Sequence, residues 1–210
     1  MSIVFDGVTT VIGHNTVIDH INCTMQTGSI TGLKGINGSG KTMMMRLIAG
    51  LIYPTEGRVI VEGKVVGKEI GFPPSLGLML ENPAFLDAYS GYENLKLLAG
   101  INHKISDSGI RKALSRVDLL ENKDKKYRKY SLGMKQRLGI AAAIMEDPAL
   151  LLLDEPTNSL DESGVELVKQ IVREERARGA TVVLSCHDAA ILEGLADEII
   201  SLKRGRIVSA

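Results

Sequence analysis

The chain has 210 residues, of which 44% are hydrophobic and 24% are charged, and its 25 basic and 25 acidic side chains give a formal net charge of zero. This length suffices for one domain with its own core, and the apolar fraction excludes a disordered chain. The balanced charge excludes the overall basic surface of a dedicated nucleic-acid-binding protein. No apolar run approaches the roughly 20 residues needed to cross a bilayer.

The start of the chain and its two cysteines indicate the compartment. Residues 1–6 lack both the positive start and the apolar stretch of a secretory signal, so we expect a protein that stays in the cytoplasm. Cys23 and Cys186 lie far apart and form no C-x-x-C pair, which indicates neither a disulfide framework nor a zinc site. We expect both to be buried free thiols.

The N-terminal part begins with strands and passes into a strand–loop–helix unit. Apolar, β-prone stretches in 1–34 are broken by glycines such as Gly7, which predicts short strands and turns. A glycine-rich turn then leads into 41–49, a helix-compatible run that ends at a glycine. Two further strands are predicted near 58–61 and 76–80.

The middle of the chain has a different periodicity. Apolar side chains recur at i, i+3, i+4 and i+7 both in 110–117 and in 138–145, which is the spacing of one helix face. This spacing therefore predicts an inserted helical subdomain over residues 82–147.

The last third alternates buried strands with helices, as parallel βαβ units do. A final edge strand is predicted at 205–208. The predicted fold class is α/β, a single domain over 1–210 whose core is formed by 1–81 and 148–210. Strands are predicted at 150–153, 181–184 and 198–202, and helices at 162–178 and 188–196.

A phosphate-binding loop is predicted at 35–42, where Gly-Ile-Asn-Gly-Ser-Gly-Lys-Thr matches G-x-x-x-x-G-K-[ST] after a strand and before a helix. Glycines let backbone N–H groups surround phosphate oxygens, and the helix N-terminus adds partial positive charge. We expect Lys41 to bind the β- and γ-phosphates and Thr42 to ligate Mg²⁺. The other loop residues expected to bind nucleotide are Asn37, Gly38, Ser39, Gly40 and Met43.

A pair of carboxylates, Asp154 and Glu155, follows the buried strand at 150–153. In proteins with a phosphate-binding loop, such an aspartate holds Mg²⁺, which leaves the next carboxylate free to polarise the attacking water. The implied reaction is nucleotide hydrolysis. The alternative is a plain acidic turn before Pro156, which the phosphate-binding loop disfavours.

Further stretches resemble motifs of the ATP-binding subunits of ABC transporters, and the resemblance covers essentially the whole chain. Tyr-Ser-Leu-Gly-Met-Lys-Gln-Arg at 130–137 resembles the LSGGQ signature, with Ser131 and Gly133 at the family's serine and second glycine. Asn-Ser-Leu-Asp at 158–161 resembles the D-loop. Taken alone, Ser131 is better explained as an ordinary helix cap. The order of the motifs along the chain reverses this preference and favours the family.

The same resemblance implies an architecture and a set of roles. The fold would be a RecA-like P-loop NTPase core with an N-terminal antiparallel β subdomain and an inserted α-helical subdomain that carries the signature. Two copies would enclose two ATP molecules, each between Lys41 of one copy and the signature of the other. Glu155 would be the general base, His187 after the strand at 181–184 would contact the γ-phosphate, and Asp161 would link the two sites.

The chain departs from the family pattern at three places. Glu81 stands where the family has the Q-loop glutamine, and its carboxylate is expected to bind Mg²⁺. Ile12 replaces the adenine-stacking aromatic, so we expect apolar packing on the base and weaker nucleotide selectivity. Leu132 and Met134 in the signature resemble subunits of drug, antibiotic-peptide and ABC-2 type exporters.

The expected cofactors are ATP and Mg²⁺, and the expected partners are a separate transmembrane permease and a second copy of the chain, with no nucleic acid. The resemblance places the protein on the inner face of the cell membrane, held there by the permease. Phe85, Tyr89 and Tyr92, together with the Q-loop, are the candidate permease groove, with core packing as the alternative. The basic run at 123–129 is interpreted as a solvated face.

Two other functions compete with this interpretation. A soluble ABC ATPase acting on ribosomes or DNA usually carries tandem cassettes or basic extensions, which are not visible in 210 neutral residues. A P-loop nucleotide kinase would need an arginine-rich lid in place of the signature and the switch histidine.

Overall fold

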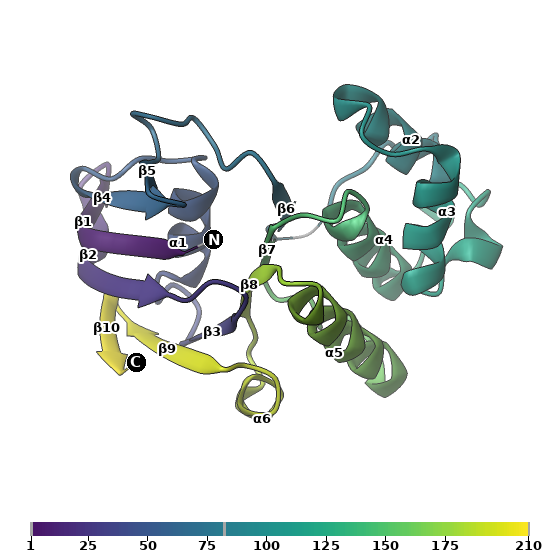
Figure 1. The fold of residues 1–210 in the computed structure, drawn as a ribbon. Helices are drawn as coiled ribbons and strands as arrows, with labels where there is room; N and C mark the ends of the chain where they lie inside the picture. Colours follow the sequence, from purple (N-terminus) through teal and green to yellow (C-terminus); the bar gives the residue numbers. More distant parts are fainter. Residues whose placement is uncertain (1, 82, 210) are drawn as a thin grey trace.

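The computed structural model describes residues 2–81 and 83–209. A four-stranded antiparallel sheet in the order β2-β1-β4-β5 covers one side of the molecule (Figure 1). The sequence predicted a break at Gly7, but strand β1 continues through it. Gly7 has a φ of +61° and lies where the β1–β2 register shifts, at an irregularity inside β1. The strands are β1 (Ile3–Ile12), β2 (Asn15–Met25), β4 (Glu56–Val61) and β5 (Lys64–Val65).

A six-stranded sheet in the order β10-β9-β3-β8-β7-β6 forms the centre of the molecule. Its first five strands in the chain pair in parallel, and β10 is the antiparallel edge strand that the sequence predicted. The α/β fold class is thus confirmed. The strands are β3 (Ile30–Lys34), β6 (Leu76–Met79), β7 (Leu150–Leu153), β8 (Thr181–Ser185), β9 (Glu198–Lys203) and β10 (Arg206–Ser209).

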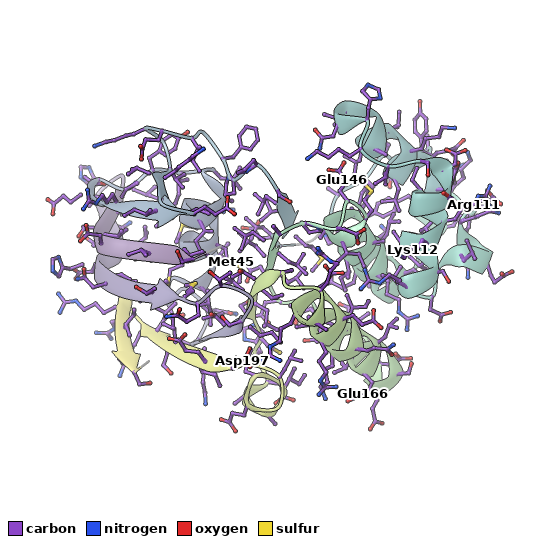
Figure 2. The ribbon with its side chains drawn as sticks, in the orientation of Figure 1. Met45, Arg111, Lys112, Glu146, Glu166 and Asp197 are labelled. Atoms are coloured by element: carbon purple, nitrogen blue, oxygen red, sulfur yellow. The ribbon has the colours of Figure 1, made fainter. Side chains whose placement is uncertain are left out.

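The apolar run of β7 is explained by burial on both faces of this sheet. Leu150 and Leu152 belong to the apolar cluster under the antiparallel sheet, whereas Leu151 and Leu153 belong to the cluster under the helices. A strand covered on both faces cannot alternate apolar and polar residues, so it appears as a continuous hydrophobic run. Helix α1 (Lys41–Ala49), which carries the buried Met45 labelled in Figure 2, packs in the first of these clusters, and helices α5 (Glu162–Ala177) and α6 (Ala189–Glu193) pack in the second.

The helices of the middle segment gather at one side of the molecule (Figure 1). They are α2 (Gly91–Asn102), α3 (Asp107–Arg116) and α4 (Leu132–Ile144), with short 3-10 turns at Leu120–Asn122 and Tyr127–Lys129. Helix α2 begins at a capping box in which Ser90 Oγ accepts a hydrogen bond from the N–H of Glu93, and the backbone N–H of Ser90 donates to the Glu93 carboxylate. The division of the chain into 1–81, 82–147 and 148–210 stays a prediction, and Asn82 lies outside the described residues.

The two cysteines are free but not equally buried. Cys186 is buried, as expected, whereas Cys23 on β2 is only half-buried, which corrects the sequence expectation. Desolvation and the neighbouring Glu198 raise the pKa of the Cys23 thiol to about 12. In 2–81 and 83–209, no helix is both long enough and apolar enough to cross a membrane.

Candidate functional site

The carboxyl ends of the parallel strands meet at one edge of the central sheet, and a cleft of about 920 Å³ opens there. This edge is where open α/β sheets bind ligands, because the loops after the strands converge on it. Loops after β3, β6, β7 and β8 all contribute. The residues that line the cleft are Ile12, Asn15, Thr16, Val17, residues 37–43, Glu81, Gln136, Asp154, Glu155, Asn158, His187, Arg204 and Gly205.

The loop after β3 is shaped to hold an anion. Gly40, at φ +115°, precedes α1 and caps it without a side chain, so the first N–H groups of the helix face the cleft without a side-chain partner. The Nζ of Lys41 folds back and donates to the carbonyl of Gly35 at 2.7 Å. Ser39 Oγ is buried without a hydrogen-bond partner, and a Cβ at Gly35 would lie 2.4 Å from it. The loop thus fits a phosphate group.

Asp154 is buried, with 4% of its surface exposed, and it joins three elements. Thr42 Oγ1 on α1 donates to its Oδ2 at 2.5 Å, and the hydroxyl of Ser185 at the end of β8 donates to its Oδ1. Hydroxyl and carboxylate oxygens at one point are the ligands that Mg²⁺ prefers. Thr42 and Asp154 therefore fit the metal that the sequence predicted.

Glu155 follows in a left-handed conformation, with a φ of +50°, which turns its carboxylate toward the phosphate-binding loop. Its Oε1 lies 3.3 Å from His187 Nε2 and 3.7 Å from Lys41 Nζ, and its Oε2 accepts the backbone N–H of His187 at 3.0 Å. The backbone of Glu155 is fixed by the Ser185 hydroxyl and the Gln136 side-chain amide, both at 2.9 Å. Glu155, His187 and Lys41 thus meet in one cluster, and their catalytic roles stay a prediction.

The remaining predicted residues lie elsewhere. Ser131, Gly133 and Asp161 line a separate hollow of about 480 Å³. Ser131 caps α4 by accepting the N–H of Met134 at 3.2 Å, and Asp161 caps α5 by accepting the N–H of Gly164 at 2.9 Å. That hydrogen bond, with smaller contributions from Ser163 and Arg137, lowers the pKa of Asp161. One copy of the chain therefore keeps its signature apart from its phosphate-binding loop.

Two of the three departures from the family pattern lie at the cleft, whereas Leu132 and Met134 line the separate hollow. Ile12, at the end of β1, is 49% exposed and lines the cleft, as expected. Glu81 also lines it, but its Oε1 lies 2.5 Å from Arg46 Nη2 on α1. Its role as a metal ligand stays a prediction.

The candidate permease groove has mixed support. Phe85 packs edge-on against the buried Tyr127 ring, with centroids 5.4 Å apart, and Tyr92 packs partly on the helical core. Tyr89 is exposed. Core packing therefore accounts for two of the three aromatic residues, and the groove stays a prediction.

Among the residues in the cleft or buried behind it, Ser185, Gln136 and Arg204 were missed by sequence reasoning although they contact or border the predicted site. Ser185 bonds both acidic residues, and Gln136 on α4 bonds the backbone of Glu155; each stands in a recognised motif but carried no predicted role. Arg204, in the turn between β9 and β10, lines the cleft because Gly205 donates to the carbonyl of Ser39 at 2.9 Å. No sequence pattern indicates that contact, since it depends on how the last hairpin packs.

A glycine-rich loop between a parallel strand and a helix, with an Asp–Glu pair ending a neighbouring strand, defines a P-loop nucleoside triphosphatase. The sequence profile of the ABC transporter family matches residues 18–158. The chain therefore belongs to the ABC transporter family, as an ATP-binding subunit with ATPase activity.

Curated relatives carry the same description. The uncharacterized ABC transporter ATP-binding protein YybJ of Bacillus subtilis (strain 168) is 46% identical, over 93% of this chain and 90% of that protein. The bacitracin transport ATP-binding protein BcrA of Enterococcus faecalis is 41% identical over 93% of this chain, which spans only 64% of BcrA. The lantibiotic transport ATP-binding protein SrtF of Streptococcus pyogenes is 34% identical, over 93% and 84%.

Solved structures share the fold. A dimeric ATP-binding cassette in a post-hydrolysis state, bound to ADP and Pi, has a TM-score of 0.89 at 23% identity, covering 99% of this chain and 97% of that one. A nucleotide-free cassette from an ABC transporter has a TM-score of 0.84 at 22% identity, covering 100% and 90%. The expected architecture is thus confirmed.

Proposed function

We propose that two copies of this chain close on two ATP molecules and so drive a separate membrane permease, on the inner face of the cell membrane, in the direction of export. The observation that carries the proposal is the separation of Ser131, Gly133 and Asp161 from the cleft in one copy. A signature that lies outside the nucleotide cleft of its own copy fits a site completed by a second copy. The bacitracin and lantibiotic transport descriptions of two relatives support an exporter.

Within the cleft, each predicted side chain has a task. Lys41, 6% exposed, balances the negative charge of the phosphates from the loop side. Thr42 and Asp154 would hold Mg²⁺, which when bound neutralises charge on the phosphate oxygens. Glu155 accepts the proton of the attacking water at Oε1, which lies on the side facing Lys41 and His187.

The histidine orients this base. The backbone N–H of His187 donates to Glu155 Oε2, and His187 Nε2 lies 3.3 Å from Oε1, which has no hydrogen-bond partner among the described residues. A carboxylate fixed through one oxygen keeps the free lone pairs of the other in one direction, which favours proton transfer. His187 is itself exposed at the cleft, where it is free to contact the γ-phosphate.

Closure of the two copies supplies the movement. Ser131 and Gly133 present the N-terminus of α4, whose N–H groups and partial positive charge attract an anion. ATP bound by one copy would therefore pull the signature of the other copy toward it, and loss of the γ-phosphate would release it.

The test is Glu155→Gln, which keeps the shape of the side chain but removes the base. We expect ATP hydrolysis to fall by at least about 100-fold, while ATP binding persists and traps a dimer on gel filtration. Adding Lys41→Ala to this variant should abolish the dimer, because the phosphates lose their cation. Near-native turnover of Glu155→Gln, or a monomer at saturating ATP, would contradict the proposal.

A further inference from the structure

An ion pair at the edge of the nucleotide cleft joins Glu81 to Arg46. Arg46 Nη2 lies 2.5 Å from Glu81 Oε1, and the two side chains are 33% and 61% exposed. Glu81 follows β6 with a φ of +58°, a conformation that residues with a side chain seldom adopt. Since so exposed a pair contributes little to folding stability, its effect has to be sought in the cleft.

The position of Arg46 ties this pair to the proposed metal site. Arg46 is four residues after Thr42 on α1, so the two side chains share one helix face, about 6 Å apart along the axis. Glu81 lines the same cleft as Thr42 and Asp154. The charge on Glu81 therefore acts on whatever occupies the phosphate-binding loop.

The three carboxylates of the cleft differ in what balances them. Asp154 accepts hydrogen bonds from two hydroxyl groups, and Glu155 lies near Lys41 and His187. For Glu81, Arg46 is the one bonded cation in the described part of the chain. Without Arg46, Glu81 would place an unbalanced negative charge beside the anionic phosphates, and like charges at such a site repel.

We propose that Arg46 is a positioning residue that holds the Glu81 carboxylate at the cleft edge and cancels its charge toward a metal-free triphosphate. Glu81 then has to leave Arg46 before it can ligate Mg²⁺. This inference rests on the proposed function and adds a condition to it: the substitution of the usual glutamine by Glu81 is tolerated because Arg46 accompanies it. If this inference holds, breaking the ion pair changes ATP affinity by different amounts with and without Mg²⁺.

The experiment measures ATP affinity by calorimetry, once in EDTA and once in Mg²⁺. Arg46→Met should weaken metal-free ATP binding by about five-fold but MgATP binding by less than about two-fold, because the freed Glu81 can then ligate the metal. Glu81→Gln should strengthen metal-free binding by about three-fold, since Arg46 keeps its charge. The double variant restores neutrality and should return to within about two-fold of the unmodified chain.

A matched control is Arg58→Met. Arg58 forms a similarly exposed pair with Asp6 at 2.8 Å, in the antiparallel sheet and away from the cleft, so ATP affinity should not change in either condition. An equal loss for Arg46→Met with and without Mg²⁺, or a double variant that stays weak, would overturn this inference alone. Failure of the unmodified chain to bind ATP would overturn the proposed function and this inference with it.

Discussion

The nucleotide cleft and the signature hollow are built from neighbouring elements but differ in completeness. In the cleft, the buried side chains of Lys41 and Asp154 and the partly buried Glu155 already contact neighbouring protein groups. In the hollow, Ser131 and Asp161 are exposed. Each caps its own helix, and Asp161 also lies 3.7 Å from Arg137 Nη2 on α4.

Because of this difference, we expect ATP binding to depend on the cleft, and completion of the ATP site to depend on the hollow of a second copy. A pre-organised cleft binds its ligand without a second copy, because little side-chain freedom is left to lose. A helix N-terminus at the surface can act on an anion only when one is brought to it. The two regions should therefore respond differently to the same kind of damage.

The largest expected contrast is in ATP binding by the monomer. Lys41→Ala should weaken ATP binding by at least about 100-fold, because the phosphates lose a buried cation. Ser131→Arg should change monomer affinity by less than about two-fold, because Ser131 lies outside the cleft. Calorimetry at concentrations below dimerisation measures both. A large loss for Ser131→Arg would remove the distinction between the two regions.

Mixing the two variants tests whether the regions meet across copies. Each variant alone should be nearly inactive, whereas an equal mixture should regain about a quarter of the unmodified ATPase activity. Half of the dimers are then mixed, and each of those holds one intact site and one that is doubly damaged. A steady-state ATPase assay over a range of mixing ratios is the measurement, and activity that never exceeds the separate variants would speak against shared sites.

Behind the cleft, the buried Ser185 supports both acidic residues, and Ser185→Ala should reduce kcat by about ten-fold with little change in KM. Ser185 bonds the carboxylate of Asp154 and the backbone N–H of Glu155, so its loss loosens both acidic residues without removing either. Ser185→Thr, which keeps the hydroxyl, is the matched control and should retain more activity. Equal activity of Ser185→Ala and the unmodified chain would show that the positions of these carboxylates do not depend on Ser185.

The smallest expected effect separates a helix cap from a ligand-binding role. Ser131→Ala and Ser90→Ala each remove an N-cap and should each cost about 1 kcal/mol of unfolding free energy, or roughly 2–4 °C in Tm. Only Ser131→Ala should also lower ATPase activity. Thermal melts and ATPase assays on both variants measure this, and equal activity loss would assign Ser131 a purely structural role.

Most of the elements could be predicted from the sequence because their signals are local. Helix α1 begins at Lys41 and ends at Ala49 as predicted, since Gly40 and Gly50 both take left-handed conformations at its ends. The strand at β7 was visible as a leucine run. The interruption expected at Gly7 was wrong because strand pairing accommodates an irregularity there, and pairing partners are distant in sequence.

The sequence by itself determined the chemistry of the site: a glycine loop, a lysine, two carboxylates and a histidine, each next to a strand end, are recognisable by local spacing. Only the tertiary structure decided their partners. Ser185 at Asp154, Arg46 at Glu81 and the turn of Arg204 against the phosphate-binding loop all depend on which strands and hairpins lie side by side. The physical reason is that these contacts join residues far apart in the chain, whereas spacing along the chain reports only near neighbours.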